Sequence, residues 1–172
     1  MSVPEPTAAV PPPDVATFRR VGGRFATGVC VLATVDGGFD HAMTASAFTT
    51  VSLEPMLVLA CVDTEARFHD AVVSAGEWAV SILDAESRPA SDWLASRGRP
   101  LVGQLDRIPF HRGPLTGAAL VDSALGWLEC RTTAVHPAGD HSIVVGEVVG
   151  LELGPADGVP LLYFRSGYHK LA

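Results

Sequence analysis

The sequence predicts a mainly β protein, an antiparallel barrel or sandwich with a few flanking helices. About seven segments have the apolar, β-branched composition of strands, and most of them are separated by short turns. Few segments have helical spacing, so strands do not alternate with helices as they do in a doubly wound sheet. The length of 172 residues, 48% of them hydrophobic and 18% charged, suits one domain with a full core.

A proline-rich stretch over residues 1–13 opens the chain. Its five prolines cannot occupy a helix interior and lack backbone donors, which predicts an extended or disordered N-terminal arm. We expect a single folded domain over residues 14–172, beginning with a helix that Asp14 caps. The apolar positions of this helix recur every three to four residues and are Val15, Phe18, Val21 and Phe25.

The sequence of the first half of the domain predicts three strands followed by a helix. Asp36-Gly37-Gly38 supplies the chemistry of a hairpin turn after the first strand, and Glu54-Pro55 separates the second strand from the third. Gly76 closes the helix. We expect these elements at residues 29–35, 41–50, 56–62 and 65–75.

The second half predicts four more strands, one short helix and one long loop. The segment 97–115 is rich in Gly, Pro and Arg, and its length is typical of a functional or covering loop. We expect the strands at residues 77–83, 125–135, 142–153 and 161–164, and the helix at residues 87–96.

The charge balance argues against a general nucleic-acid binder. Twelve Lys and Arg against nineteen Asp and Glu give a net charge of −7, whereas nucleic-acid binding requires an excess of basic residues. A local basic pocket for one phosphate remains compatible with this total. No apolar stretch approaches the ~20 residues of a membrane helix, and no signal peptide is recognisable. We therefore expect a cytoplasmic protein without a membrane partner.

The motifs of hydrolases, Rossmann domains and metal sites are missing from the sequence. Residues 23–28 have phosphate-loop spacing, but Val29-Cys30 stand where Lys and Ser or Thr are required. No G-x-G-x-x-G, G-x-S-x-G or H-E-x-x-H occurs, and the six histidines are scattered. Cys30, Cys61 and Cys130 form no C-x-x-C pair, and we interpret them as buried apolar residues.

A run of hydroxyl side chains marks the expected strand at 41–50. On one continuous strand, every second residue would face the same side, which suits a flat ligand that forms many hydrogen bonds. A solvated edge strand is the alternative interpretation. The residues concerned are Thr44, Ser46, Thr50 and Ser52.

Three further positions suit a nucleotide ligand. Arg67 stands in the first turn of the expected helix, where it would meet a phosphate together with free N–H groups, or would simply be a surface arginine. His141 follows a turn and precedes a strand, so it is either a cleft residue or a structural one. Arg165 and Tyr168 are suited to stack on an aromatic nucleotide.

An ordered series of motifs runs through the chain from Phe18 to Leu171. They are Phe25-Ala26-Thr27-Gly28-Val29, Met43-Thr44-Ala45-Ser46-Ala47-Phe48, Val51-Ser52-Leu53-Glu54-Pro55, Leu57-Val58-Leu59-Ala60-Cys61-Val62-Asp63, Leu128-Glu129-Cys130-Arg131, Gly139-Asp140-His141 and Pro160-Leu161-Leu162-Tyr163-Phe164-Arg165. In order and spacing the series resembles the short-chain flavin reductases, the reductase components of two-component flavin-dependent monooxygenases. The resemblance implies a flavin reductase-like domain over 14–172. It also implies a six-stranded antiparallel Greek-key split barrel of the FMN-binding type, dimeric, with flavin near the subunit interface.

The same resemblance implies the site residues. Thr44, Ala45, Ser46 and Ala47 would line the isoalloxazine edge through backbone amides and the Ser46 hydroxyl. Cys61, Val62 and Asp63 would flank the ribityl chain, and Arg67 with Phe68 would hold the phosphate end. The nicotinamide nucleotide would contact His141, the catalytic candidate, and Phe164, Arg165, Ser166 and Gly167. No metal is implied. Positions 65 and 66 depart from the family, because they read Glu-Ala where a Ser often precedes the arginine.

The implied reaction passes a hydride from C4 of NADH or NADPH to N5 of FMN or FAD, with no protein nucleophile. Reduced flavin then leaves for a separate oxygenase. A flavin carrier with the same barrel, a pyridoxamine-phosphate-oxidase-like enzyme and a purely structural dimerisation module are the alternatives. The choices between FMN and FAD and between NADH and NADPH stay open. Arg97 and Arg99 are able to meet a 2′-phosphate, although we interpret them as part of a solvated basic loop.

Overall fold

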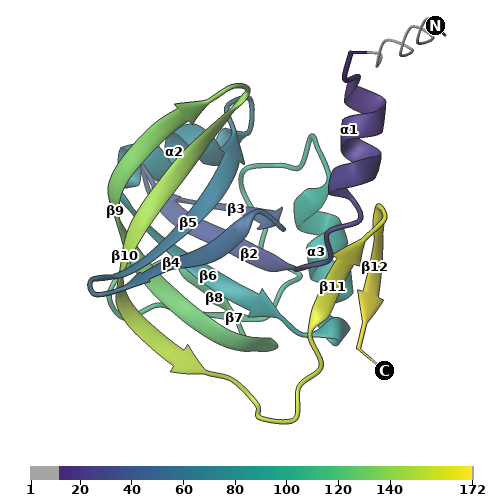
Figure 1. Ribbon diagram of the computed structural model, residues 1–172. Coiled ribbons are helices and arrows are strands. Elements are labelled where there is room, and N and C mark those ends of the chain that lie inside the picture. Colours follow the sequence, from purple (N-terminus) through teal and green to yellow (C-terminus); the bar gives the residue numbers. More distant parts are fainter. Residues whose placement is uncertain (1–11, 172) are drawn as a thin grey trace, which may run out of the picture.

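Seven strands form one antiparallel sheet that curls into a barrel (Figure 1). The structure, a computed structural model, describes residues 12–171. The order of the strands in the sheet is β3-β2-β6-β9-β10-β5-β4. Their bounds are Cys30–Asp36 for β2, Phe39–Ala45 for β3, Phe48–Leu53 for β4, Met56–Asp63 for β5, Glu77–Leu83 for β6, Ala124–Ala138 for β9 and His141–Leu153 for β10.

The two edges of this sheet are consecutive in the chain. β3 lies at one edge and β4 at the other, and only Ser46 and Ala47 connect them. The Cys61 N–H donates to the Ala47 carbonyl at 2.9 Å, which attaches this connection to β5. A chain that passes from one edge to the other in two residues requires the sheet to roll up. The predicted mainly β, antiparallel class is therefore confirmed.

The single strand predicted over 41–50 is wrong, because it is broken at Ser46 and Ala47. Thr44 belongs to β3 and Thr50 to β4, so the hydroxyl residues do not share one strand face. The break follows from barrel closure, a long-range requirement, and the local alternation of residues does not reveal it. Counting the broken strand once gives the six strands that were expected.

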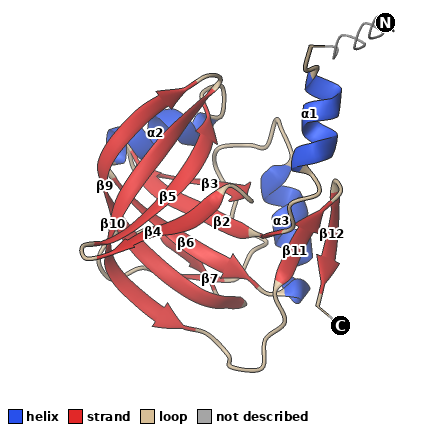
Figure 2. Ribbon diagram, viewed as in Figure 1, coloured by secondary structure: helices blue, strands red, loops and turns tan. Residues whose placement is uncertain are grey.

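Three helices and one 3-10 turn flank the barrel (Figure 2). They are α1 (Val15–Gly22), α2 (Arg67–Ala75), the 3-10 turn Ala85–Ser87 and α3 (Arg88–Ala95). Asp14 caps α1 by accepting from the Thr17 N–H at 2.9 Å, as predicted. The helix ends at Gly22 rather than continuing to Phe25, since the Gly pair favours termination. No helix of the described part of the chain is long and apolar enough to cross a bilayer.

Five short strands complete the fold. β1 (Thr27–Gly28), β11 (Leu161–Phe164) and β12 (Gly167–Lys170) form a small sheet beside α1, and β7 (Phe110–Arg112) pairs with β8 (Ala119–Val121). β7 lies within the long loop expected over 97–115. β12 was not expected because its four residues are short of apolar side chains, and its pairing with β11 stabilises it. The proline-rich arm predicted over 1–13 falls almost wholly outside the described residues.

Two buried clusters occupy opposite faces of the central strands. Alternate residues of β2 enter different clusters, Leu32 one and Val31 the other. The Leu32 cluster includes Phe68 and Val72 of α2, so this helix packs on the barrel interior. The Val31 cluster includes Leu94 of α3. Helices α2 and α3 thus cover opposite faces of the sheet. Both helices contact β3, and α2 also contacts β5.

Candidate functional site

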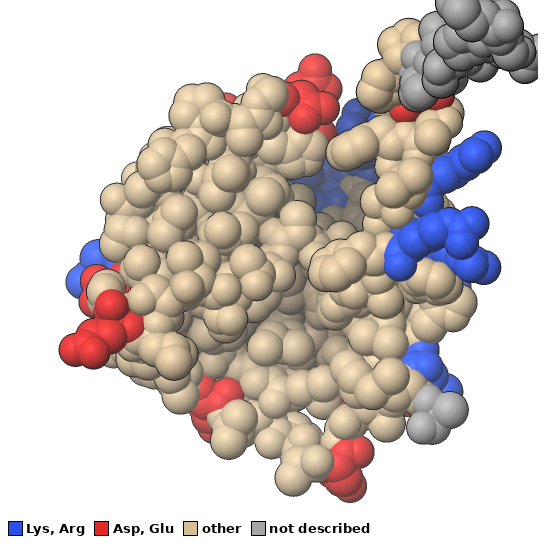
Figure 3. Space-filling view, viewed as in Figure 1, with Lys and Arg blue, Asp and Glu red and all other residues tan. Residues whose placement is uncertain are grey.

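Two hollows lie beside the ends of β3 and β5. The first, the arginine hollow, has a volume of about 540 Å³. The second, the Phe25 hollow, has a volume of about 560 Å³. Figure 3 shows the surface hollowed between the barrel and the α1 side, with basic side chains at depth. The arginine hollow is lined by residues 41–44, 63, 65–68, 94–99 and 104, and the Phe25 hollow by residues 25–28, 46–49, 59 and 61.

Residues close together on β5, and residues at the end of β3 and in the break that follows it, line different hollows. Thr44 and Asp63 line the arginine hollow, whereas Ser46, Ala47 and Cys61 line the Phe25 hollow. The structure thus brings together two segments that the sequence suggested separately. The arginine hollow adjoins the end of β3, the Phe25 hollow adjoins the break that follows it, and β5 lines both.

Three of the predicted residues are buried in the core. Ala45 is 7% exposed, Val62 1% and Phe68 3%, and all three belong to the cluster inside the barrel. Phe68 also closes one wall of the arginine hollow. The side chains of Ala45 and Val62 therefore hold the strands in place, and only their backbone groups remain for a ligand.

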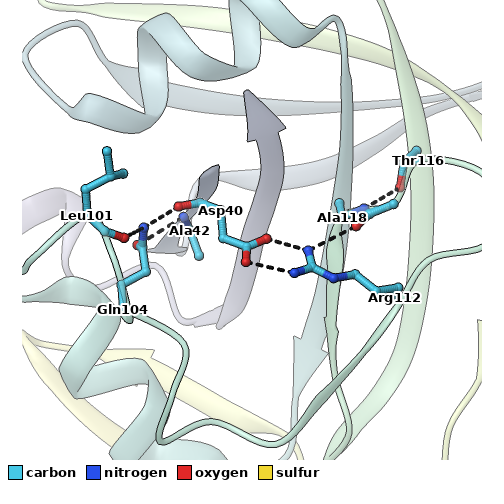
Figure 4. A network of polar contacts seen from close by, with 8 residues as sticks. Asp40, Ala42, Leu101, Gln104, Arg112, Thr116 and Ala118 are labelled. Carbon is cyan, nitrogen blue, oxygen red and sulfur yellow. Dashed lines mark hydrogen bonds and ion pairs between the residues drawn. The ribbon is translucent and has the colours of Figure 1, made fainter. Parts of the chain in front are cut away.

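The free edge of β3 is capped by a side-chain amide. Gln104, 3% exposed, donates to the Asp40 carbonyl and accepts from the Ala42 N–H at 3.3 Å (Figure 4). This amide thus occupies the place of a neighbouring strand. Since backbone groups of alternate residues point to the same edge, Thr44 presents its N–H and C=O there too, inside the arginine hollow.

An ion pair fastens the loop between α3 and β7 to the same strand. Arg112 forms a bidentate ion pair with the Asp40 carboxylate, in which Nη2 donates to Oδ2 at 2.9 Å (Figure 4). Its Nη1 also donates to the Gly117 carbonyl at 3.1 Å. The hydrogen bond to Asp40 raises the pKa of Arg112. The segment 97–115 is therefore attached to β3 at Asp40 and Ala42.

The turn from β5 into α2 is held by hydrogen bonds to Asp63. Asp63 accepts from the Glu65 N–H at 2.8 Å, and its carbonyl accepts from the Ala66 N–H at 3.0 Å. Ala66 is the N-cap and supplies no side-chain hydrogen bond, which agrees with the departure noted at positions 65 and 66. The first turn of α2 therefore keeps N–H groups without a capping side chain, beside Arg67.

His141 begins β10 and lines neither hollow. It lies opposite Asp63 in the ladder between β10 and β5, and its Nδ1 is 2.8 Å from the Asp140 carboxylate. This hydrogen bond, followed by the charge of His141, lowers the pKa of Asp140. The Thr64 N–H and hydroxyl both donate to the Asp140 carbonyl at 3.1 Å, which ties this turn to the end of β5.

The segment 164–167 forms the tight turn between β11 and β12, and none of its residues lines a hollow. Arg165 and Ser166 have φ of 49° and 62°, so both adopt the left-handed conformation. The Arg165 N–H donates to the Gly23 carbonyl at 2.7 Å, and its guanidinium lies over the Phe164 ring at 5.0 Å. The turn therefore contacts residue 23, just before the segment 25–28 that lines the Phe25 hollow. It is far in sequence from the candidate residues 44–47 and 61–68.

The Tyr168 side chain is held by contacts with other parts of the fold. Its hydroxyl accepts from Ser91 at 2.8 Å, and its ring packs between Arg88 and Tyr163. The expectation that Tyr168 grips a nucleotide is not supported by these contacts.

A hydrogen-bonded Asp–His–Ser series lies outside both hollows. His69 contacts Asp70 at 3.0 Å and Ser142 at 2.9 Å. Ser142 is only 6% exposed and lines no hollow, so the series anchors α2 to β10. Within residues 12–171, no three His, Cys, Asp or Glu side chains gather closely enough to hold a metal ion.

The sequence interpretation missed the walls that α3 and the following loop contribute. Arg97 is 88% exposed, as a solvated loop residue should be, but Arg99 is half-buried and donates to the Ala42 carbonyl at 3.0 Å. Arg99 and Ala42 are 57 residues apart, so no local signal could have placed them together. His41, Met43 and the residues at the end of α3 also line the hollow without any motif to mark them.

The geometry fits a long, anionic ligand with a flat ring. The free polar edge at Thr44 and the exposed Ser46-Ala47 backbone offer hydrogen bonds to a ring edge. Arg67 and the uncapped start of α2 offer positive charge at the other end. A flavin nucleotide has this chemistry, and the residues present therefore fit one.

Comparison with known proteins agrees with this fit. Residues 22–172 match the family model of the flavin reductase like domain. The chain is 40% identical over 152 residues to the NADH-dependent FAD reductase of Streptomyces globisporus, covering 88% of this chain and 83% of that protein. It is also 40% identical over 154 residues to the reductase component of 4-hydroxyphenylacetate 3-monooxygenase from Thermus thermophilus, covering 90% and 95%.

A solved structure shares the whole architecture. The Streptomyces globisporus NADH:FAD oxidoreductase, in complex with NAD and FAD fragments, superposes with a TM-score of 0.88 at 34% identity, covering 96% of this chain and 98% of that one. The curled antiparallel sheet and its flanking helices thus have counterparts in a flavin oxidoreductase structure. The chain belongs to the flavin reductase like domain family.

Proposed function

We propose that this chain is an NAD(P)H:flavin oxidoreductase that supplies reduced FMN or FAD to a separate monooxygenase. The observation that carries the proposal is the pair of hollows at the end of β3 and at the β3–β4 break, with an arginine-rich end and a ring-sized polar edge. The relatives named as NADH-dependent FAD reductase and as a monooxygenase reductase component support the same assignment.

In this proposal the chain binds and orients two nucleotides. Ser46 and Ala47 hold the ring edge through backbone groups, Asp63 lies beside the ribityl chain, and Arg67 meets the phosphate. When bound, the flavin supplies a hydride acceptor, so the protein needs no nucleophile of its own. Orientation of the two rings at van der Waals contact then provides much of the rate.

The nicotinamide side of the site is assigned to His141 and to the turn 164–167. His141 is fixed by its bond to Asp140 and by its place opposite Asp63, so it can hold a nicotinamide nucleotide beside the flavin end. Its imidazole is 42% exposed and is free to donate or accept through Nε2.

The test is oxidation of NADH and NADPH by the purified full chain, with and without FMN, FAD or riboflavin. The proposal expects oxidation that depends on added flavin and exceeds the rate of free flavin alone. A protein that retains flavin through desalting yet adds nothing to that rate would be a flavin carrier. Absence of any flavin-dependent oxidation would overturn the assignment.

The proposal includes a homodimer, because α1 has an unpartnered apolar face. Val15, Phe18 and Val21 are 66%, 75% and 65% exposed, and no residue of this eight-residue helix is buried. Figure 1 shows α1 standing away from the barrel. An isolated helix shorter than ~12–15 residues is marginal in water, so α1 needs a surface to pack on. In the proposal this surface is a second copy of the chain, whose other exposed apolar residues include Leu53 and Leu153, 89% and 88% exposed.

Light scattering of the purified chain tests the dimer. We expect twice the chain mass for the native protein and a shift toward monomer for Phe18→Glu. Val102→Glu, at a 72% exposed position in the α3–β7 loop, is the matched control and should leave the mass unchanged. A native protein that is monomeric at every concentration would contradict this part of the proposal. The cytoplasmic location expected from the sequence remains a part of the proposed function.

A further inference from the structure

Arg67 and Arg99 stand together in the wall of the arginine hollow. The Arg67 guanidinium donates to the Arg99 carbonyl at 2.6 Å. Among the described residues, acidic side chains pair with Arg88, Arg97, Arg112 and Arg131, but with neither Arg67 nor Arg99. Two like charges are thus held close together in a chain whose net charge is −7, and Asp63 and Glu65, which line the same hollow, form an ion pair with neither of them.

The Arg99 side chain is fixed by neutral acceptors only. Its guanidinium donates to the carbonyls of Ser96 and Ala42, the latter at 3.0 Å, and its Nε is buried without a partner. Burial lowers the pKa of Arg99, and the positive charge of Arg67 lowers it further. Arg97, two residues earlier, instead extends into solvent and lies 3.7 Å from Asp63. An unneutralised cation in a partly desolvated wall is unfavourable until an anion joins it.

The arginine hollow is larger than one phosphate group requires. Its volume of about 540 Å³ matches that of the Phe25 hollow and is in the range of a complete ligand site. Leu94 and His41 also line it, so an apolar wall and an aromatic ring are available in the same hollow. The ring end of a flavin in the Phe25 hollow would leave most of this second space for a further nucleotide half.

We propose that Arg67 and Arg99 bind the diphosphate of a dinucleotide, and that Arg99 makes this chain prefer FAD to FMN. The inference rests on the proposed function and deepens it by naming the flavin. Arg67, beside the open start of α2, serves the phosphate that FMN and FAD share. Arg99 serves the second phosphate, which only FAD carries. FAD is favoured over NADH as the source of the diphosphate, because β5 lines both this hollow, at Asp63, and the one that suits the flavin ring, at Leu59 and Cys61.

Equilibrium binding separates the contributions of the two arginines. Dissociation constants are measured by quenching of flavin fluorescence for riboflavin, FMN and FAD, which carry zero, one and two phosphates. We expect Arg99→Met to weaken FAD binding about tenfold or more, with FMN changed less than about threefold and riboflavin unchanged. Arg67→Met should weaken FMN and FAD alike. Arg99→Lys should retain part of the FAD affinity, because lysine keeps the positive charge but cannot form the bidentate hydrogen bonds of a guanidinium.

The matched control is Arg107→Gln, which removes one positive charge from an exposed position of the same loop and should change no dissociation constant. Equal weakening of all three flavins by Arg99→Met would show a purely structural role and overturn the proposal. Equal weakening of FMN and FAD, or no change, would overturn it too. Weakened binding of NAD⁺ with FAD unaffected, measured by calorimetry, would assign the pair to the nicotinamide nucleotide instead. If native protein binds no flavin at all, it is the proposed function that fails.

Discussion

His141, the first residue of β10, lies directly opposite Asp63, the last residue of β5, in an antiparallel ladder. The ladder fixes the distance between a residue assigned to the nicotinamide side and one assigned to the flavin side. Seven consecutive residue pairs join the two strands, from His141–Asp63 to Glu147–Leu57. In the proposed function, this ladder sets the relative position of the two nucleotides, and two mobile loops are not needed for it.

Replacement of His141 by Ala should raise the KM for the nicotinamide substrate about three- to tenfold, the equivalent of one lost hydrogen bond. The KM for flavin should change less than about twofold, since Asp63 and the β5 end are untouched. Steady-state kinetics with each substrate varied in turn provide the measurement. His136→Ala, at an exposed position of β9, is the control. An unchanged nicotinamide KM would remove His141 from this role.

The titration of Asp140 should report its bond with His141. Because His141 lowers the pKa of Asp140, this interaction stabilises the folded protein above the ordinary value of 3.8 and is lost as the pH falls through the lowered value. Carbon NMR of the carboxyl group should therefore show a midpoint below 3.8. His141→Ala should return this midpoint toward 3.8. A midpoint unaffected by His141→Ala would refute the coupling.

Loss of the Gln104 amide should destabilise the fold. Gln104→Ala leaves the Asp40 carbonyl and the Ala42 N–H without their partner, which should lower the free energy of unfolding by about 1–3 kcal/mol. Urea unfolding measures this change. Val102→Ala, in the same loop but 72% exposed, should cost less than about 0.5 kcal/mol. Equal midpoints for the Gln104 variant and the native protein would show that water replaces the amide without loss.

The three cysteines should differ in reactivity. Burial raises the pKa of Cys30 to about 12, and burial followed by the charge of Glu129 raises that of Cys130 to about 12. Alkylation requires the thiolate, so both should stay unmodified in folded protein at pH ~8. Cys61 is only half-buried and lines the Phe25 hollow, so it should be the labelled residue.

Flavin should protect Cys61 from the reagent if the ring occupies that hollow. Mass spectrometry of digested protein, labelled with and without FMN, gives the answer. Labelling of Cys61 at the same rate in both samples would place the ring elsewhere. Cys30, 3% exposed, serves as the internal control, because it should remain unlabelled in both.

The predictable parts of the fold are those that local chemistry specifies. β6 has the bounds expected from its composition, and α2 ends at Gly76, whose φ of 68° suits a glycine. The break at Ser46-Ala47 could not be predicted, because closure between distant strands determines it. The same applies to Arg99, whose partner Ala42 lies on a strand far away in the sequence. Seven of the fourteen residues named from the family resemblance line the two hollows, whereas Ala45, Val62, His141 and residues 164–167 do not. The walls that α3 and the following loop contribute depend on long-range packing.

The unfilled edge of β3 has a consequence for handling the protein. Closed barrels avoid aggregation by leaving no strand edge unpaired, and here Gln104 and Arg99 cover the edge at Asp40 and Ala42 but not at Thr44. The uncovered stretch is a template on which another strand can pair. Protein purified with bound flavin should therefore remain unaggregated at concentrations at which the flavin-free protein self-associates. The solubility of a preparation would then indicate how much of the site holds flavin.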